Sequence, residues 1–322
     1  MMAAPMSDTT VRATALVADR RSDAVMLGRR LAEETGDPDR FAAVLSAGLA
    51  ELADRESLAG QRRVAPGIGD LHGVPWPLIE AVKRGFREET RRERTSGWLF
   101  IADRLLGEPR LEAQWFAFGL LERLIVDDTE RTWQLIRRAA RQTADWITVD
   151  SLAHPVAKGI LNEAYRWAEL EQLVYSPSRW ERRLVGSTIA TMPFVDRRRG
   201  REPEVAVHGL GLIHELIGDN EPDVQKALAW ALRSMAAVDH AATTSFLESE
   251  SIQAVARSDG NRAWVVRDAL PKLDPGDAER IRARLAGVRR RAGAPSTSRA
   301  AETASRFGAG LLGRPQPEPP LA

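Results

Sequence analysis

The 322-residue sequence contains no cysteine. This absence excludes disulfide bonds, a thiolate nucleophile, zinc fingers and iron–sulfur clusters. Histidine is scarce, and the five that occur form neither an HExxH motif nor a close pair on one helical face. We therefore expect no bound metal and no cofactor. The histidines are His72, His154, His208, His214 and His240.

Long apolar runs are missing as well. No run approaches the roughly 20 residues that a membrane-spanning helix needs. Residues 1–6 lack a basic region followed by an apolar stretch, so they do not match a signal peptide. We expect a cytoplasmic protein that makes no membrane contact.

An excess of one charge is also absent, because 46 Lys and Arg residues face 45 Asp and Glu residues. A surface that binds nucleic acid must therefore arise from how the charges are distributed. Most of the cations are arginines, whose planar guanidinium suits phosphate contacts better than a lysine ammonium does.

Strand-like alternation, βαβ units and phosphate-binding glycine loops are almost absent. Apolar residues instead recur at helical spacing, separated by short breaks. Proline and polar residues mark several helix starts: Pro77 at a first position, Asp128 or Thr129, Pro177 or Ser178, and Pro222 with Asn220 as the cap. The predicted helices are 23–52 (interrupted at Pro38), 78–90, 112–124, 129–141, two within 153–172, one through Trp180, and 224–237.

Helix pairs at a spacing of roughly 35–45 residues predict an all-α, HEAT-like helical-repeat solenoid. Such stacks present a concave face built from their inner helices, and we expect this face to bind DNA. We expect residues 1–20 to be a flexible tail and residues 21–291 to be the repeat domain. Residues 292–322 are rich in Ala, Pro, Ser and Gly, so we expect a disordered tail there.

The run Pro66-Gly67-Ile68-Gly69 suggests an alternative DNA-binding element, because it resembles the hairpin of helix-hairpin-helix modules. That hairpin needs a helix directly after its glycines. Pro75 and Pro77 follow instead, and proline is tolerated only in the first turn of a helix. The sequence therefore favours a turn-rich connector.

Two stretches carry tryptophan next to charged residues. Trp146 and Asp150 are four residues apart and share one face of a helix. Lys226, Trp230 and Arg233 recur at helical spacing. Singly, such a Trp is more often a core residue and such an Asp more often a helix cap. As a set they indicate one wall that holds DNA, with Asp150 as its acidic chemical group. Trp180, Arg182 and Arg183 belong to the same set.

A basic, proline-bounded segment spans residues 193–203. Its arginines could be simply solvated, or they could form a finger that reaches a phosphate backbone. They are Arg197, Arg198, Arg199 and Arg201.

Three blocks together resemble the AlkD family of DNA alkylation-repair glycosylases over about residues 60–290. The blocks are Trp-Ile-Thr-Val-Asp-Ser (146–151), Trp-Glu-Arg-Arg (180–183) and Gln-Lys-Ala-Leu-Ala-Trp-Ala-Leu-Arg (225–233), and Gly-Val-Pro (73–75) resembles the family's N-terminal entry. The chain departs from the family at Ile147, where a polar residue is common, and in the longer stretch between Arg183 and Trp230.

The resemblance implies a monofunctional enzyme that excises cationic purines, such as 3-methyladenine and 7-methylguanine, from duplex DNA while the lesion stays stacked. It places the catalytic trio on Trp146, Asp150 and Trp230, and a phosphate contact on Arg183. Arg182, Arg233, Lys226 and the basic segment would add DNA contacts. We expect a monomer. Two alternatives stay open: a non-catalytic relative that binds DNA structures, and a helical scaffold for protein partners.

Overall fold

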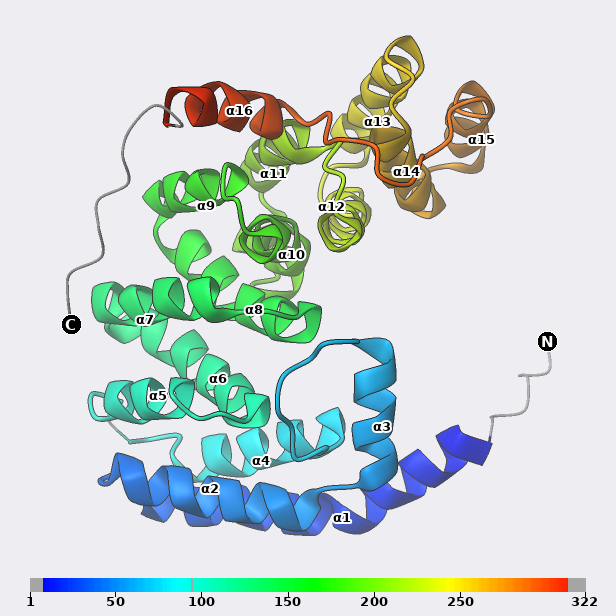
Figure 1. The fold of residues 1–322 in the computed structure, drawn as a ribbon. Helices are drawn as coiled ribbons and strands as arrows, with labels where there is room; N and C mark the ends of the chain where they lie inside the picture. The colour runs from blue at the N-terminus through cyan, green and yellow to red at the C-terminus, as the bar shows by residue number, and fades with distance from the viewer. Residues whose placement is uncertain (1–7, 94, 312–322) are drawn as a thin grey trace. The chain divides into compact units, whose positions relative to one another are not determined.

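The computed structural model describes residues 8–93 and 95–311. In this part of the chain it contains sixteen α-helices and three 3-10 helices without any strand, apart from one isolated bridge between Asp70 and Arg110 (Figure 1). The expected all-α, helical-repeat class is confirmed. None of the described helices combines the length and the apolar character needed to cross a membrane.

The described helices fall into two compact units, Met1–Gly159 and Ile160–Ala322. The first is unit 1 and the second is unit 2. The boundary lies in the last turn of α8, so the expected single repeat domain of residues 21–291 is divided.

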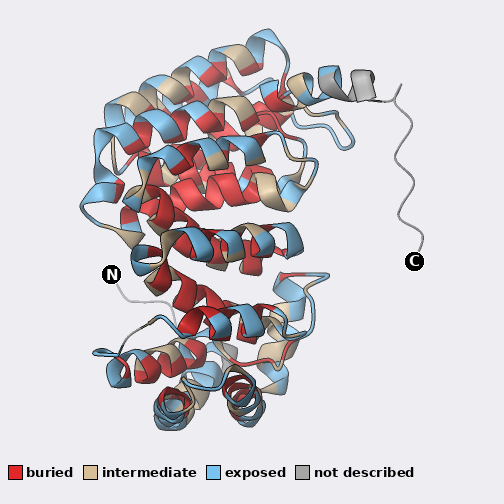
Figure 2. Ribbon diagram, turned by 90° about the vertical axis from the view of Figure 1, so that its left-hand side faces the viewer, coloured by how far each residue is buried: buried red, intermediate tan, exposed pale blue. Residues whose placement is uncertain are grey.

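The helices of unit 1, α3 excepted, bury one face and leave the other exposed (Figure 2). Its centre is an aromatic cluster in which Phe86 contacts Phe41, Trp98 and Phe116, with ring centroids 5.0–5.7 Å apart. The helices are α1 (Asp8–Glu33), α2 (Pro38–Leu52), α3 (Arg55–Val64), α4 (Trp76–Glu89), α5 (Trp98–Leu106), α6 (Leu111–Asp127), α7 (Thr129–Gln142) and α8 (Trp146–Asn162).

The pairing of α1 with α4 depends on a glycine from each helix. A Cβ on Gly28 would lie 2.1 Å from the Val82 carbonyl oxygen, and a Cβ on Gly85 would lie 2.2 Å from that of Val25. These distances are impossible for real atoms, so the two backbones can approach this closely only with glycine on both sides.

The start of α1 corrects the expected tail of residues 1–20 over residues 8–20, because the helix begins at Asp8, and residues 1–7 lie outside the described residues. Polar contacts hold this part in place. Arg12 Nη2 lies 2.9 Å from Asp54 Oδ1, and Arg20 Nη1 donates to the Glu51 carbonyl at 2.7 Å. Apolar periodicity does not record such contacts, so the sequence pattern underestimated the helix.

The connector between α3 and α4 is held in place by hydrogen bonds to a buried carboxylate, that of Glu112. Glu112 is fully buried, and its oxygens accept the backbone N–H groups of His72 (3.1 Å), Gly73 (2.8 Å) and Val74 (3.3 Å). No helix follows the glycines of residues 66–69 directly, because α4 starts only at Trp76, which makes Pro77 its second residue. The helix-hairpin-helix alternative is therefore wrong.

We expect Glu112→Gln to lower the stability of unit 1 by about 2 kcal/mol, because an amide has one acceptor oxygen for three donors and no charge. Urea unfolding followed by tryptophan fluorescence measures this loss. The exposed Glu88 of α4 provides the matched control, Glu88→Gln. Equal midpoints for the two variants would show that the Glu112 carboxylate contributes little.

Unit 2 is built around α10 (Arg179–Val195) and α12 (Pro222–Met235), which pack along each other. A Cβ on Gly186 of α10 would lie 2.8 Å from the Ala227 carbonyl carbon, which marks the closest approach of the two helices. The other elements are η1 (Ala164–Arg166), α9 (Trp167–Val174), η2 (Arg199–Arg201), α11 (Pro203–Leu216), α13 (His240–Ala256), α14 (Gly260–Ala269), η3 (Leu270–Lys272), α15 (Pro275–Arg284) and α16 (Arg299–Leu311).

Most of the expected helix starts are confirmed. Asp128 precedes α7 as its N-cap, Ser178 precedes α10, and Pro222 lies in the first turn of α12. The N-cap of α12 is Glu221, however, and the expected Asn220 lies one residue earlier.

Helix α16 corrects the expected disordered tail of residues 292–322 over residues 299–311. The segment is anchored where it meets α11: Thr297 N–H donates to the Gly218 carbonyl at 2.9 Å, and Ala300 is buried. Residues 312–322 of the expected tail lie outside the described residues.

Candidate active site

Trp146 and Asp150 lie one turn apart at the start of α8 in unit 1. The adjacent Asp145 caps this helix, since its Oδ1 accepts the Thr148 N–H at 2.9 Å. Asp150 stands in the second turn and is partly exposed. The interpretation of Asp150 as a helix cap therefore fails, because Asp145 performs that role.

The opposite side of α8 fixes the helix to unit 1. Val149 and Leu152 are fully buried, and Trp115 Nε1 on α6 donates to Thr148 Oγ1 at 3.0 Å. The partly exposed positions of the helix lie on the other side and include Trp146 and Asp150. The indole and the carboxylate therefore share the partly exposed face of a helix whose opposite face is buried in unit 1.

A third element touches this face. Trp146 Nε1 donates to the carbonyl oxygen of Val64, the last residue of α3, at 3.4 Å. The two residues are 82 positions apart, and sequence spacing gave no signal of this contact.

A small cavity of about 330 Å³ is lined in part by Ser151, the residue that follows Asp150 in the sequence. His154 of α8 and Trp76 and Lys83 of α4 also line it. The Lys83 ammonium lies 5.0 Å from the centre of the Trp76 ring and 3.0 Å from Glu80 Oε1. Burial lowers the pKa of Lys83, and the nearby Glu80 opposes this effect. No sequence pattern predicted this cavity.

In unit 2, Lys226, Trp230 and Arg233 form one stripe along α12. The remaining residues of this helix from Val224 to Met235 are buried. Trp230 is partly exposed and Lys226 is exposed. The interpretation of Trp230 as a core residue therefore fails, because it lies on the one open stripe of an otherwise enclosed helix.

Three of the predicted DNA-binding arginines are engaged by unit 2 itself. Arg183 is buried and donates from Nη1 to the Asp223 carbonyl at 2.7 Å, which ties α10 to the first turn of α12. Arg233 Nη1 contacts Asp268 Oδ2 at 2.5 Å. Their contact with phosphate stays a prediction, and it would compete with these bonds.

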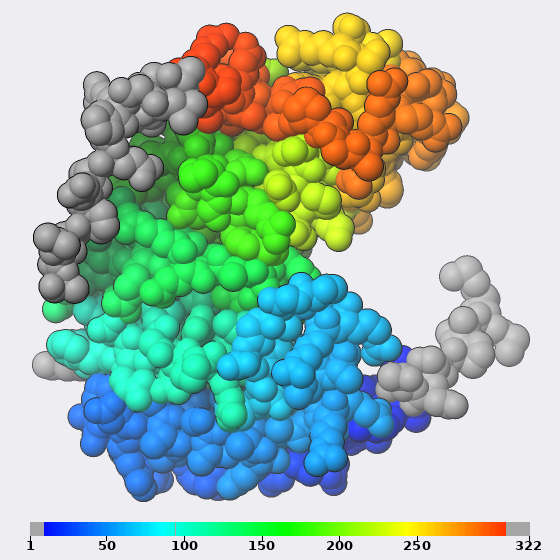
Figure 3. All heavy atoms as spheres, viewed as in Figure 1, coloured from blue at the N-terminus to red at the C-terminus, as the bar shows by residue number. Residues whose placement is uncertain are grey.

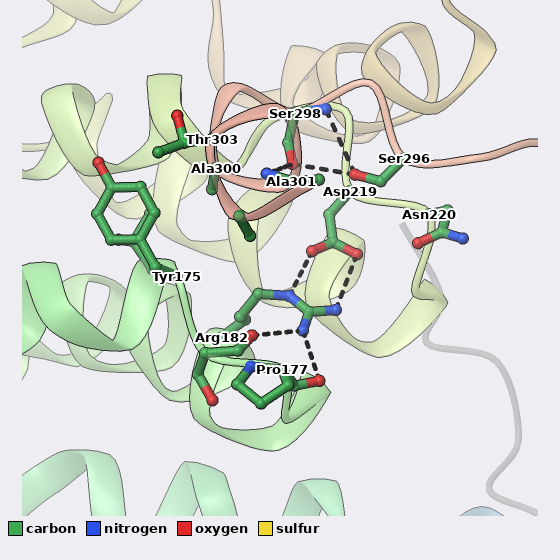
Figure 4. A pocket seen from close by; sticks show the side chains of 13 residues that line it. Tyr175, Pro177, Arg182, Asp219, Asn220, Ser296, Ser298, Ala300, Ala301 and Thr303 are labelled. Atoms are coloured by element: carbon green, nitrogen blue, oxygen red, sulfur yellow. Dashed lines mark hydrogen bonds and ion pairs between the residues drawn. The ribbon is translucent and has the colours of Figure 1, made fainter. Parts of the chain in front are cut away.

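Arg182 is the third, and it lines a cavity of about 870 Å³ between the end of α9, the start of α10 and α16 (Figure 4). Its Nε donates to Asp219 Oδ2 at 2.7 Å, and its Nη1 donates to the carbonyls of Ser176 and Pro177. These contacts use most of the donors of the guanidinium. Arg182 therefore stabilises the connection between α9 and α10.

The basic segment forms a compact turn, and contact of its arginines with DNA stays a prediction. Pro193 still belongs to α10, and Asp196 Oδ1 accepts the N–H groups of Arg198 and Arg199, both at 2.9 Å. These backbone N–H groups, that of Arg199 first, lower the pKa of Asp196. Gly200 is buried, and its Cβ position lies 2.0 Å from the Met192 carbonyl oxygen. The side chains of Arg197, Arg198, Arg199 and Arg201 are exposed, and residues 196–202 are called the arginine turn below.

The structure thus groups Trp146 with Asp150 in unit 1, and Lys226 with Trp230 and Arg233 in unit 2. Among the described side chains, no cluster of three or more His, Asp or Glu residues is arranged to hold a metal ion. An acidic group beside a partly exposed indole can stabilise a cation.

No curated protein matches this sequence closely enough to count as a relative. The family model described as DNA alkylation repair enzyme matches residues 45–273. This span covers more than half of the chain and contains α8, α10 and α12 with all the candidate site residues. The chain therefore belongs to the DNA alkylation repair enzyme family.

Proposed function

We propose that the protein is a monofunctional DNA glycosylase that removes cationic alkylpurines, such as 3-methyladenine and 7-methylguanine, from duplex DNA. One observation carries the proposal above the others. Asp150 is a partly exposed carboxylate one turn after a partly exposed Trp146, and the helix cap is supplied by Asp145. In this proposal Asp150 supplies the negative charge that the reaction needs.

The chemistry follows from the charge of the substrate. Alkylation at N3 or N7 makes the purine cationic and weakens its bond to the sugar, so the base leaves without an acid. Positive charge then develops on the deoxyribose. The Asp150 carboxylate stabilises that charge and orients the attacking water.

Two indoles, those of Trp146 and Trp230, add cation–π stabilisation of the positive charge in this proposal. Trp146 lies beside Asp150 on α8, and Trp230 lies on the open stripe of α12. The face of an indole attracts a cation through its quadrupole, by about 0.5–2 kcal/mol depending on desolvation. We propose that Trp146 and Trp230 both act in excision, that the lesion stays stacked in the duplex, and that one protein molecule acts alone.

Phosphate contacts come in this proposal from cations that are open to solvent. Lys226 is exposed next to Trp230, and the arginine turn carries four exposed guanidinium groups. Arg182, Arg183 and Arg233 are held by unit 2, so they act on DNA after exchanging those bonds or through their charge alone.

The test uses duplex DNA methylated with dimethyl sulfate and chromatography of the free bases. The proposal predicts release of 7-methylguanine and 3-methyladenine and abasic sites without strand cleavage. DNA binding without base release would instead identify a non-catalytic DNA-structure-binding protein. Absence of DNA binding at low salt would identify a scaffold.

The arginine turn gives a separate prediction. Replacing Arg197, Arg198, Arg199 and Arg201 with glutamine should flatten the salt dependence of DNA affinity, by about 0.9 in log–log slope for each lost phosphate contact. Titrations at several salt concentrations measure the slope. The matched variant with four lysines keeps the charge and should keep the slope; an unchanged slope in the glutamine variant would mean that the turn is only solvated.

A further inference from the structure

Helix α3 (Arg55–Val64) is unusual because none of its residues is buried. Figure 1 shows it projecting from the end of α2, and Figure 3 shows its atoms (light blue) at the surface. A helix of this length is marginal in water unless something outside it holds it. Because α3 buries no residue, polar contacts contribute much to holding it in place.

Those contacts lie at its two ends. At the start, Asp54 Oδ2 accepts the Ser57 N–H at 2.8 Å, and Arg12 contacts Asp54 Oδ1 at 2.9 Å. Towards the end, Gln61 Nε2 donates to the Val74 carbonyl at 3.0 Å. Burial raises the pKa of Asp54, but the bonds from Arg12 and Ser57 outweigh it, so the pKa is lowered overall.

The acidic residues at the start of α3 have ion-pair partners, whereas its arginines do not among the described side chains. Arg12 binds Glu56 at 2.9 Å as well as Asp54, so both acidic residues are paired. Arg55, Arg62 and Arg63 are exposed, and the described side chains offer none of them an ion pair or a hydrogen bond. Unpaired guanidinium groups on an exposed helix present a positive surface that fits an anionic partner.

The C-terminal end of α3 meets the candidate active site. The last carbonyls of a helix lack donors within the helix. The Val64 carbonyl finds one in the Trp146 indole N–H, at 3.4 Å. The two arginines just before Val64 therefore sit on the backbone segment that touches Trp146, within unit 1 and independently of unit 2.

We propose that residues 55–68, the α3 arm, bind the phosphate backbone of duplex DNA next to the nucleotide that Trp146 contacts, with Arg62 and Arg63 as the contacting residues. The inference rests on the proposed function for the identity of that nucleotide. The binding itself needs only duplex DNA. Neighbouring helix positions point about 100° apart, so the two guanidinium groups address different phosphates.

The experiment measures affinity for an undamaged duplex of defined length across a range of salt concentrations. The variant is Arg62→Ala/Arg63→Ala. Its control is Arg29→Ala/Arg30→Ala, which removes the same charge from two adjacent exposed residues of α1 in the same unit. Circular dichroism and thermal unfolding check that both variants fold.

Loss of two phosphate contacts should reduce the log–log salt slope by about 1.8. The control should match the wild type. The rate of base release at saturating enzyme should change less than about threefold, because the groups that stabilise the sugar cation are intact.

Equal slopes for the wild type and both variants would overturn the inference, and so would an equal loss in the control, which would indicate only a general charge effect. The two proposals can fail independently. A reduced slope in Arg62→Ala/Arg63→Ala, together with no base release by any form, would support DNA binding by the α3 arm and contradict the glycosylase proposal. Normal base release with an unchanged slope would support the glycosylase proposal and contradict DNA binding by the α3 arm.

Discussion

Replacing Asp150 with asparagine should slow the release of 7-methylguanine at least about 100-fold, because removal of one preorganised electrostatic contact typically costs 10²–10³ in rate. The amide keeps the size and shape of the carboxylate but cannot neutralise the charge that develops on the sugar. Single-turnover kinetics on a duplex with one lesion measure the chemical step directly. DNA affinity should change little.

The chain provides a close control for this variant. Asp145→Asn alters the carboxylate five residues earlier on the same segment, and asparagine caps helices about as well as aspartate. It should retain the wild-type rate. Equal losses in both variants would trace the effect to α8 stability and remove Asp150 from the chemistry.

The two indoles give the second large effect. Trp146→Ala and Trp230→Ala should each reduce the single-turnover rate about 30-fold, which corresponds to ~2 kcal/mol of lost cation contact in a desolvated site. Phenylalanine at either position should restore part of the rate, because its ring face still attracts a cation. Trp264→Ala is the matched control, since Trp264 is a partly exposed tryptophan of α14 in unit 2 that already contacts Arg290.

A double-mutant cycle of the two tryptophans tests whether they serve one nucleotide. Residues that share a ligand show coupling of about 0.5–3 kcal/mol, whereas independent residues add within about 0.5 kcal/mol. Because Trp146 belongs to unit 1 and Trp230 to unit 2, measurable coupling would mean that both units act on the same lesion. Strict additivity would count against a common site.

The sequence predicted those helices whose apolar residues follow helical spacing. Helices α4, α6, α7 and α12 lie within a few residues of the predicted ranges. It did not predict α3, because a helix without buried residues has no apolar stripe to detect. The start of α1 and helix α16 were missed for a related reason: polar anchors such as Arg12–Asp54 and Thr297–Gly218 hold them.

The candidate site was predictable where it depends on local spacing. Trp146 and Asp150 share a helix face because they are four residues apart. Which aspartate caps α8 was not predictable, because Asp145 and Asp150 both stand near its start. The engagement of Arg182 was also hidden, since its partner Asp219 lies 37 residues away and only the packing of unit 2 brings them together.

Base excision as proposed depends on one carboxylate, that of Asp150, stabilising positive charge on a deoxyribose. The most direct measurement is the affinity for a duplex in which a cationic pyrrolidine replaces the sugar of one nucleotide. Analogues of a transition state bind at least about 100-fold more tightly than the ground state when a site is built for it. The wild type should show such a preference over an uncharged abasic analogue, and Asp150→Asn should lose it. Equal affinity for the two analogues in the wild type, or an equal preference in Asp150→Asn, would contradict the proposed chemistry.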